Sequence, residues 1–438
     1  MRTQAPLFFF LLGLTACTAS QLDPGATAEN GDALTLGLDG STLLTPPNFA
    51  GGVTDYRSVP ETRVTLPAAG SYFTDPDFHT RIIRVTNAAS LGASDCQHSY
   101  SVVPAMNLDS TYVLANCNGL RVFRLDKTTD HTTYVNTVTA GQPYTINWES
   151  AYWSNVSPNI LYVLGNNSGQ RHTKIFRVDV TRTDAGRFTV LKDLTGVWSG
   201  SWNLWQLSVS WDDNVFSFHA RDTSGNYYRT GAYIKSTNHF MSFPDTTYDV
   251  DESYVEKGGR YINIIGKGAN AYQVKTWNLS TNGVMATLTN SSTNKTGGHY
   301  DLGSTYWVNG DRYLTGSVVR TWTGITSPRN VFQYKTSSGS LNWAIADHIS
   351  MRNADESFFL TSTYGSISSS WPAFQHEIVL VKTNGGGFSR VAHTRSTGAA
   401  DSYWSQPRAV IDHDGRYVVF TSDNGTTQTD VYILKLPQ

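Results

Sequence analysis

The chain has 438 residues, of which 16% are charged and 12% aromatic, and its formal net charge is -2. The charged fraction lies below the roughly 25% of average soluble domains, whereas Gly, Ser, Thr and Asn are abundant, as expected for short strands joined by polar turns. Because no cluster of Lys and Arg is available to neutralise a run of phosphates, a role in nucleic-acid binding is disfavoured.

Residues 1–17 are typical of an export signal. Arg2 is followed by the apolar run Leu7–Leu14, which is too short to span a bilayer. The next residues, Leu14-Thr15-Ala16-Cys17, resemble the bacterial lipobox, in which the signal is cleaved before a Cys that carries lipid. We therefore expect an exported lipoprotein of the cell envelope or surface, attached to a membrane through Cys17 only. The alternative is an ordinary secretory signal that is cleaved nearby.

Residues 18–71 are rich in Gly, Ala, Thr, Asp and Pro and show no sustained apolar period. This composition predicts a flexible tether. The folded domain is then expected to comprise residues 72–438, as a monomer.

Two cysteines, Cys96 and Cys117, follow the predicted lipidation site. An oxidising compartment permits them to pair, and they flank an early strand of the first repeat described below. A local disulfide is the favoured interpretation, and two buried free thiols are the alternative.

One pattern then returns along the chain: a polar turn with Asp, Asn or Gly, a β-branched or aromatic run, a loop and a second such run. The spacing is about 45 to 60 residues, which is the period of propeller blades. No long amphipathic helical pattern appears. The sequence therefore predicts an all-β, seven-bladed β-propeller, with copies at residues 107–126, 157–180, 211–234, 257–279, 309–334, 353–383 and 412–436.

The last copy resembles the Asp-Gly repeat of TolB-type propellers, in the stretch Asp412–Ser422. The chain ends soon afterwards, without an outer strand for that blade. Phe78–Thr86 can supply this strand, so an N-terminal strand is expected to close the ring and cover the exposed sheet edge.

Three short motifs in the second half of the chain resemble oligogalacturonate lyases and related propeller-fold polysaccharide lyases. They are Gly298-His299-Tyr300-Asp301, Asp347-His348-Ile349-Ser350 and Tyr403-Trp404-Ser405-Gln406-Pro407-Arg408. The resemblance implies that His299 is a catalytic base and that His348 belongs to a manganese site. The remaining metal-ligand positions hold Tyr403, Gln406 and Arg408. Because Arg cannot ligate a metal, a divalent cation such as manganese or calcium is in doubt.

The resemblance implies β-elimination on an acidic polysaccharide, a reaction that needs a cation, a base and an acid. Arg408 offers a permanent charge for the substrate carboxylate, His299 a base, and Tyr403 or His348 an acid. Trp404 and Gln406 lie in the same motif and are expected to contact substrate. The alternative is a non-catalytic propeller that binds a glycan or an envelope protein, a function that the altered metal ligands favour.

Three further residues are candidates for substrate binding. His98 and Tyr100 match in residue type the His and Tyr of ulvan lyases, which act without a catalytic metal, although a packing role for Tyr100 and a turn-capping role for His98 are the favoured interpretation. His393 precedes the final blade, where it is expected to line the channel. A structural, hydrogen-bonded role is an alternative for each histidine.

Overall fold

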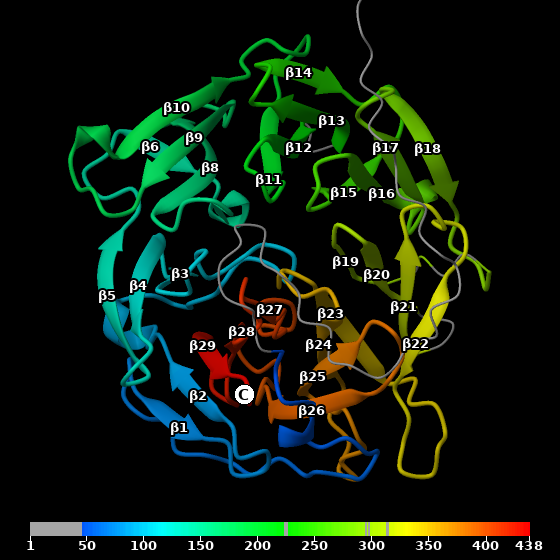
Figure 1. Cartoon of the computed structure of the whole chain (residues 1–438). Helices are drawn as coiled ribbons and strands as arrows, with labels where there is room; N and C mark the ends of the chain where they lie inside the picture. The colour runs from blue at the N-terminus through cyan, green and yellow to red at the C-terminus, as the bar shows by residue number, and fades with distance from the viewer. Residues whose placement is uncertain (1–45, 223–226, 294–295, 297, 312–314) are drawn as a thin grey trace, which may run out of the picture.

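The computed structural model describes residues 46–222, 227–293, 296, 298–311 and 315–438. Seven antiparallel sheets surround a central axis, each forming one blade of a propeller (Figure 1). The seven-bladed all-β fold predicted from the repeats is therefore confirmed. The predicted signal at 1–17, with Cys17, lies outside the described residues, as does the tether up to residue 45.

The chain enters most blades near the axis and moves outward strand by strand (Figure 1). Blade 1 has three strands, and two isolated bridges, Gln97 with Asn116 and Met106 with Val113, extend its inner edge. The strands of blades 1 to 3 are β3 (Tyr112–Asn116), β4 (Leu120–Asp126), β5 (His131–Thr137); β6 (Tyr144–Ile146), β7 (Tyr152–Trp153), β8 (Ile160–Asn167), β9 (Lys174–Asp179), β10 (Phe188–Asp193); and β11 (Asn203–Val209), β12 (Val215–Arg221), β13 (Tyr227–Ile234), β14 (His239–Ser242).

Blades 4 to 6 each have four strands in chain order, and blade 7 combines strands from both ends of the described chain. Their strands are β15 (Val250–Val255), β16 (Tyr261–Gly266), β17 (Val274–Asn278), β18 (Gly283–Leu288); β19 (Tyr300–Leu302), β20 (Tyr306–Asp311), β21 (Gly316–Thr321), β22 (Arg329–Gln333); β23 (Ile345–Ser350), β24 (Phe358–Gly365), β25 (Glu377–Lys382), β26 (Phe388–His393); and β27 (Val410–Ile411), β28 (Tyr417–Ser422), β29 (Asp430–Lys435), β2 (Arg81–Arg84), β1 (Tyr72–Thr74). In blade 7, β2 pairs antiparallel with β29, and β1 pairs with β2. The first two and the last three described strands thus belong to one sheet.

The same local device forms the turn between the first two strands of several blades. In blade 7, Asp412 Oδ1 accepts hydrogen bonds from the backbone N–H groups of Arg416 (2.7 Å) and Tyr417 (2.9 Å). Three residues after Asp412, Gly415 takes a left-handed φ of 69°. In blade 1, Asn107 accepts equivalent bonds and Ser110 has a φ of 54°. Short polar side chains that bond nearby N–H groups explain why copies such as those at 107–126 and 412–436 open with Asn or Asp.

The core is divided among the interfaces between adjacent blades. Leu360 and Leu380 of blade 6, for example, pack with Val418 of blade 7 and are fully buried. Each such side chain stabilises the fold by about 1.5–3 kcal/mol relative to exposure. The propeller is therefore held together by contacts between sheets as well as by the strand ladders within them.

The residues from 46 to 71, which we name the N-terminal strap, correct the expectation of a flexible tether. Val53 exchanges two backbone hydrogen bonds of 2.9 Å with Arg390 in β26. The buried Arg390 guanidinium donates to the carbonyl oxygens of Asp55 and Arg57, and Arg84 donates to Pro67 O. Val53 is also buried, and the Tyr56 ring packs on Phe374 and Phe388. Backbone contacts and a few scattered apolar side chains hold the strap, so its sequence shows no apolar period.

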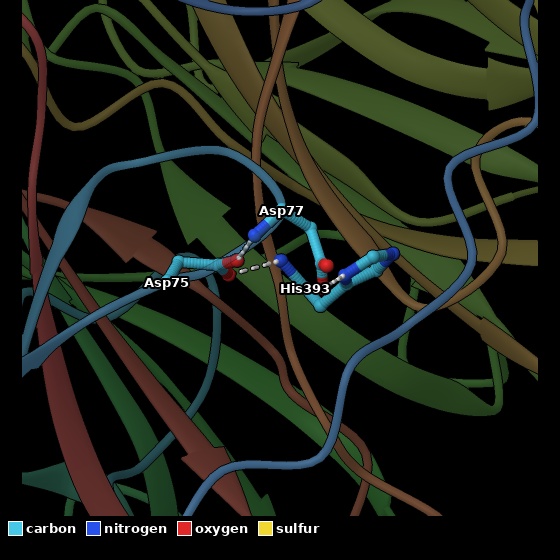
Figure 2. Close-up of side chains that lie close together, drawn as sticks. All are labelled: Asp75, Asp77 and His393. Carbon is cyan, nitrogen blue, oxygen red and sulfur yellow. Dashed lines mark hydrogen bonds and ion pairs between the residues drawn. The ribbon is translucent and has the colours of Figure 1, made fainter.

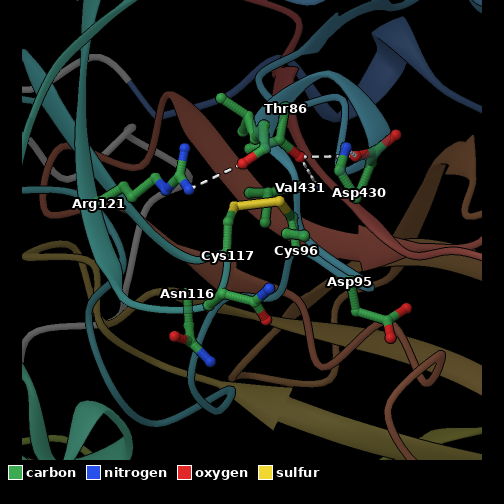
Figure 3. The surroundings of a disulfide bond; sticks show 12 residues. Thr86, Asp95, Cys96, Asn116, Cys117, Arg121, Asp430 and Val431 are labelled. Atoms are coloured by element: carbon green, nitrogen blue, oxygen red, sulfur yellow. Dashed lines mark hydrogen bonds between the residues drawn. A yellow bond between two sulfur atoms is a disulfide. The ribbon is translucent and has the colours of Figure 1, made fainter.

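The Cys96–Cys117 disulfide is present, next to the inner edge of blade 1 (Figure 3). The neighbouring residues Gln97 and Asn116 exchange two backbone hydrogen bonds, and Cys96 N donates to Thr429 O of blade 7. A cross-link that closes a loop of this length stabilises a fold by about 3 kcal/mol in the chain-entropy description. The disulfide therefore reinforces the region where blades 1 and 7 meet.

The channel is filled below one of its ends. Arg352, which follows β23, forms a buried ion pair with Asp301 of blade 5, and its Nη1 donates to Tyr152 Oη of blade 2 at 3.0 Å. Farther along the inner strands, Lys257 Nζ lies 4.3 Å from the Trp211 ring centre, and Trp211 stacks on His413 at 4.8 Å. These contacts join blades across the axis, so the open end is the one where the inner strands begin, which we call the mouth.

The described helices are single 3₁₀ turns, and none of them has the length and apolar content needed to cross a lipid bilayer. They are η1 (Phe49–Gly51), η2 (Ala89–Leu91), η3 (Trp148–Ser150), η4 (Ala185–Arg187) and η5 (Gly268–Asn270). One of them, η3, lies immediately before the inner strand β7, so the chain reaches the mouth of blade 2 through it.

Candidate functional site

Two adjoining cavities open at the mouth. The larger cavity has a volume of about 640 Å³, and the smaller cavity of about 50 Å³ is continuous with it through four shared residues. The shared residues are Tyr100, Gln206, Glu252 and Tyr403. They come from blades 1, 3 and 4 and from the segment before blade 7, so the cavities lie where loops from several blades converge.

His299 lines the larger cavity, and the buried His348 stacks against it from outside the lining. Their ring centres are 4.1 Å apart with an interplanar angle of 29°. Tyr364 also stacks on His348, with ring centres 4.8 Å apart, and Tyr100 meets His348 edge-on at 5.4 Å. The two histidines that the motifs singled out are thus brought together, from the start of blade 5 and the first strand of blade 6.

The residue before His299 explains part of its motif. A side chain at Gly298 would place its Cβ 2.6 Å from the backbone oxygen of Gly310 at the end of β20. Only glycine permits this approach, which lets His299 O accept a hydrogen bond of 2.7 Å from Gly310 N. The Gly-His pair therefore fixes the backbone from which the imidazole projects.

The tautomer of His299 is set by its hydrogen bond to the backbone oxygen of Asp347. A carbonyl oxygen only accepts, so Nδ1 carries the proton and Nε2 keeps its lone pair. Burial, offset in part by this hydrogen bond, lowers the pKa of His299 to about 4. Burial also lowers the pKa of His348 well below its ordinary value, and His299 and Arg408 add to the effect. Both imidazoles are therefore neutral at pH 7.

Arg408 lies in the segment that leads into β27, with only 2% of the residue exposed. Its Cζ lies 4.2 Å from the ring centre of Tyr403 and 4.5 Å from that of Trp404, and Nη2 donates to Tyr403 O. No described carboxylate forms an ion pair with it. Although burial lowers its pKa, a guanidinium keeps its charge at neutral pH. Glu149, which lines the smaller cavity with Arg408, attracts the guanidinium from beyond ion-pair distance. A buried positive charge that lacks a direct ion pair, beside a cavity, is suited to bind an anion.

His98 supports this arginine instead of facing either cavity. Its Nε2 lies 2.7 Å from Arg408 O, and Nδ1 lies 2.8 Å from Thr421 Oγ1. Arg408 has a left-handed φ of 43°, a conformation that its surroundings must hold in place. His98 is therefore a positioning residue, which corrects its expected role in substrate binding, whereas Tyr100 does line both cavities.

The other residues of the third motif are separated by the structure. Tyr403, which is 51% exposed, and Trp404 line the smaller cavity together with Arg408. Gln406 lies outside both cavity linings, and its Nε2 donates to Ser402 O at 3.3 Å. The expected contact of Gln406 with substrate is thus not supported by its position.

Sequence reasoning missed Glu252 because it concentrated on histidines. Glu252 lies in β15 and lines both cavities. Burial, reinforced by the charge of Asp251, raises its pKa to about 8, so this carboxyl group is largely neutral at pH 7. The signal in the sequence was the acidic pair Asp251-Glu252 in the inner strand of a blade, as Asp347-His348 lies in the inner strand of blade 6.

His393 does not line the channel, contrary to expectation. It ends β26, the outer strand of blade 6, and its Nδ1 lies 3.0 Å from Asp77 Oδ2 (Figure 2). Asp75, Asp77 and His393 place donor atoms within 4.8 Å of one another, a grouping that could hold a metal ion. Arg395 already occupies this neighbourhood, with Nη1 2.9 Å from Asp75 Oδ2, and Val59 O lies 3.0 Å from His393 Nε2. The cluster therefore ties the strap to blade 6.

A divalent cation does not fit the residues at the mouth. Among the described residues that line the two cavities, His299 is the one imidazole, because His348 stacks on it from outside both linings; the third motif contributes a phenol and a guanidinium where the resemblance expects further ligands. The charge of Arg408 lies close enough to His299 and His348 to lower the pKa values of both. A metal ion placed between the two imidazoles would therefore be repelled by Arg408. We derive no chemical step that requires a metal at this site.

No protein-family model matches the sequence, and no curated protein matches it. Among solved structures, the chain is similar to an oligogalacturonate lyase from Vibrio parahaemolyticus, with a TM-score of 0.57 and 11% identity over 85% of this chain and 99% of that chain. The likeness shows the propeller fold. A second similar structure is an oligogalacturonate lyase in complex with manganese, with a TM-score of 0.58 and 13% identity over 88% of this chain and 99% of that chain. The resemblance indicated by the three motifs is therefore confirmed for the fold.

Proposed function

We propose that this protein cleaves uronate-containing polysaccharides by β-elimination and that Arg408 takes the place of a metal ion. The observation that carries the proposal is the convergence of His299 with Arg408 and Tyr403 at one mouth, from two segments that lie about 100 residues apart in the chain. These groups supply the base, the cation and the acid that the reaction needs.

Arg408 is assigned to the uronate carboxylate. Its side chain is stacked between Tyr403 and Trp404, so little conformational entropy is lost when it binds an anion. The guanidinium also withdraws electron density from the carboxyl group, which makes the adjacent C5–H bond more acidic. Burial is the main cause of the low pKa of His299, and the charge of Arg408 adds to it. When a bound carboxylate neutralises Arg408, this second contribution is removed and the imidazole becomes a stronger base.

His299 Nε2 then takes the C5 proton. The electron pair of the C5–H bond forms the C4–C5 double bond as the C4–O bond to the next sugar breaks. The leaving oxygen receives a proton from Tyr403, whose pKa is raised mainly by burial, so its phenol is protonated at neutral pH. General acid and base catalysis by such groups contributes roughly 10² to 10⁴ in rate each.

The test is the ultraviolet absorbance of unsaturated uronate product when the purified full-length protein meets pectic, alginate, ulvan and glycosaminoglycan substrates. We expect absorbance to rise with at least one substrate and to be lost in His299→Ala and Arg408→Ala. His239→Ala, a change at an exposed histidine of β14, is the matched control and should keep full activity.

A flat trace with every substrate would contradict the lyase proposal. If the protein then still bound one of these glycans in an Arg408-dependent way, the non-catalytic glycan-binding function would replace it. Activity should also survive a metal chelator, because Arg408 supplies the positive charge. Loss of activity with chelator and recovery with manganese would contradict the metal-free assignment.

We also propose that the protein is exported and carries lipid on Cys17. The lipobox-like sequence supports this, and so does the Cys96–Cys117 disulfide, which is typical of proteins in oxidising compartments. Metabolic labelling with a palmitate analogue should mark the wild-type protein and not Cys17→Ala. Labelling of both proteins, or of neither, would contradict the anchor.

A further inference from the structure

A third cavity, which we call the outer cavity, lies between blades 2 and 3 and has a volume of about 390 Å³. It is formed by the loop between β8 and β9 and by the loop between β10 and β11. Loops of these two types, before the first strand and after the second strand of a blade, also build the mouth. The outer cavity therefore opens on the same face of the propeller as the candidate active site.

The outer cavity has the chemistry of a site for an acidic sugar. Its lining contains Arg171 and Lys174 and no Asp or Glu. Lys174 has one distant ion-pair partner, Asp193 at 3.7 Å, and none of the described carboxylates pairs with Arg171. Two cationic side chains are therefore available to an anion, and polar side chains between them can bond to hydroxyl groups.

Two tryptophans form the apolar part of the lining. Trp198 Nε1 donates to Ser242 Oγ at 2.9 Å, and its ring packs against Phe240 with centres 5.4 Å apart. Trp202 Nε1 donates to Ser199 O at 2.8 Å, and the two indole rings lie 6.2 Å apart. Both indoles are thus fixed in position and partly exposed. Rigid indole faces stack well on the apolar faces of sugar rings.

A run of residues connects this cavity to the centre of the mouth. Trp202 lines the outer cavity, and Gln206 lines both central cavities. Between them, the Trp205 ring packs against Arg221, whose Cζ lies 5.1 Å from the ring centre. Trp202, Trp205 and Gln206 lie on one segment at the start of blade 3. A glycan bound at the centre can therefore extend along this segment toward the outer cavity.

We infer that the outer cavity is a second subsite, which binds a uronate unit of a long acidic glycan whose neighbouring part occupies the central site. The inference rests on the proposed function for the nature of the glycan. It adds that the protein prefers polymers to short oligomers, because only a long chain reaches both sites.

The test compares affinities of long and short uronate oligomers for the full-length protein carrying His299→Ala, so that no cleavage occurs. We expect the long oligomer to bind more tightly. Adding Arg171→Ala and Lys174→Ala should lower the affinity for the long oligomer by about 10- to 100-fold, because charge-assisted contacts are lost. The affinity for the short oligomer should not change. Calorimetry and tryptophan fluorescence report the binding.

Matched controls keep the outcomes distinct. Arg177→Ala with Lys127→Ala removes two exposed cations outside the outer cavity and should change neither affinity. Trp202→Ala tests the stacking surface, and thermal unfolding verifies that each variant is folded. Equal affinity for both oligomer lengths, or no effect of the Arg171 and Lys174 changes, would overturn the subsite alone. Failure of every acidic oligomer to bind would overturn the proposed function as well.

Discussion

His299 and His393 hold similar places in the sequence, each next to the edge of a blade strand, yet their surroundings differ. His393 is saturated: Asp77 contacts one ring nitrogen, while Val59 O and the Trp371 indole lie at the other. His299 has one nitrogen committed to a backbone carbonyl and borders the larger cavity, beside His348, whose Nδ1 has no hydrogen-bond partner among the described residues. The comparison teaches that a place in the lining of a cavity, rather than a place in a turn, identifies a functional histidine.

The largest effect expected from this contrast is on catalysis. His299→Ala should lower kcat/KM by roughly 10² to 10⁴, because the base that takes the C5 proton is removed. Unfolding in urea should show little change, so activity and stability separate. A variant that kept most of its activity would show that His299 is not the base.

The opposite pattern is expected at the other cluster. His393→Ala should leave kcat/KM unchanged and reduce the free energy of unfolding by about 1–3 kcal/mol, because buried partners lose their hydrogen bonds. Hydrogen exchange should increase in the strap, since His393 contacts Val59. A loss of activity without a loss of stability would place His393 in the catalytic machinery.

A smaller effect concerns pH. Glu252 is neutral below its raised pKa of about 8 and becomes charged above it. Affinity for an acidic glycan should therefore fall as pH rises through about 8, by roughly tenfold, because like charges then meet at the cavity. Glu252→Gln, which stays neutral, should abolish this fall. KM measured from pH 6 to about 9 checks both proteins, and an unchanged alkaline limb in the variant would contradict the assignment.

The smallest effect is expected at Gln406. Its side chain lies outside both cavity linings. Gln406→Ala should therefore leave kcat/KM nearly unchanged and change the free energy of unfolding by less than about 0.5 kcal/mol, as ordinary surface substitutions do. Steady-state kinetics beside those of Tyr403→Phe provide the comparison. A marked loss in Gln406→Ala would mean that this residue reaches the substrate after all.

The repeat was predictable because its turns are formed by residues that lie close together in the sequence. Asn107 and Asp412, for instance, each cap a turn that a left-handed residue completes three positions later. Such signals act within five residues and can be read from the sequence. The strap could not be foreseen, since it is held by carbonyl contacts to Arg390, a residue more than 300 positions away.

The site was only partly predictable for a related reason. The motifs named His299, His348 and Arg408, and the structure brings all three to one mouth. Their residue types alone could not separate them from His98 and His393, which differ in what they contact and not in sequence context. Glu252 escaped notice because a carboxyl group matters here through its burial, and burial depends on the neighbouring blades.

The buried link from Arg352 to Asp301 and Tyr152 also decides how molecules travel through the ring. Because these side chains fill the axis at that level, the mouth is a cavity that is closed at its inner end rather than a channel through the ring. A ligand must therefore leave through the same opening by which it entered, so a second ligand can bind only after the first has been released. A long polymer cannot be threaded through the ring and is held lengthwise across its face.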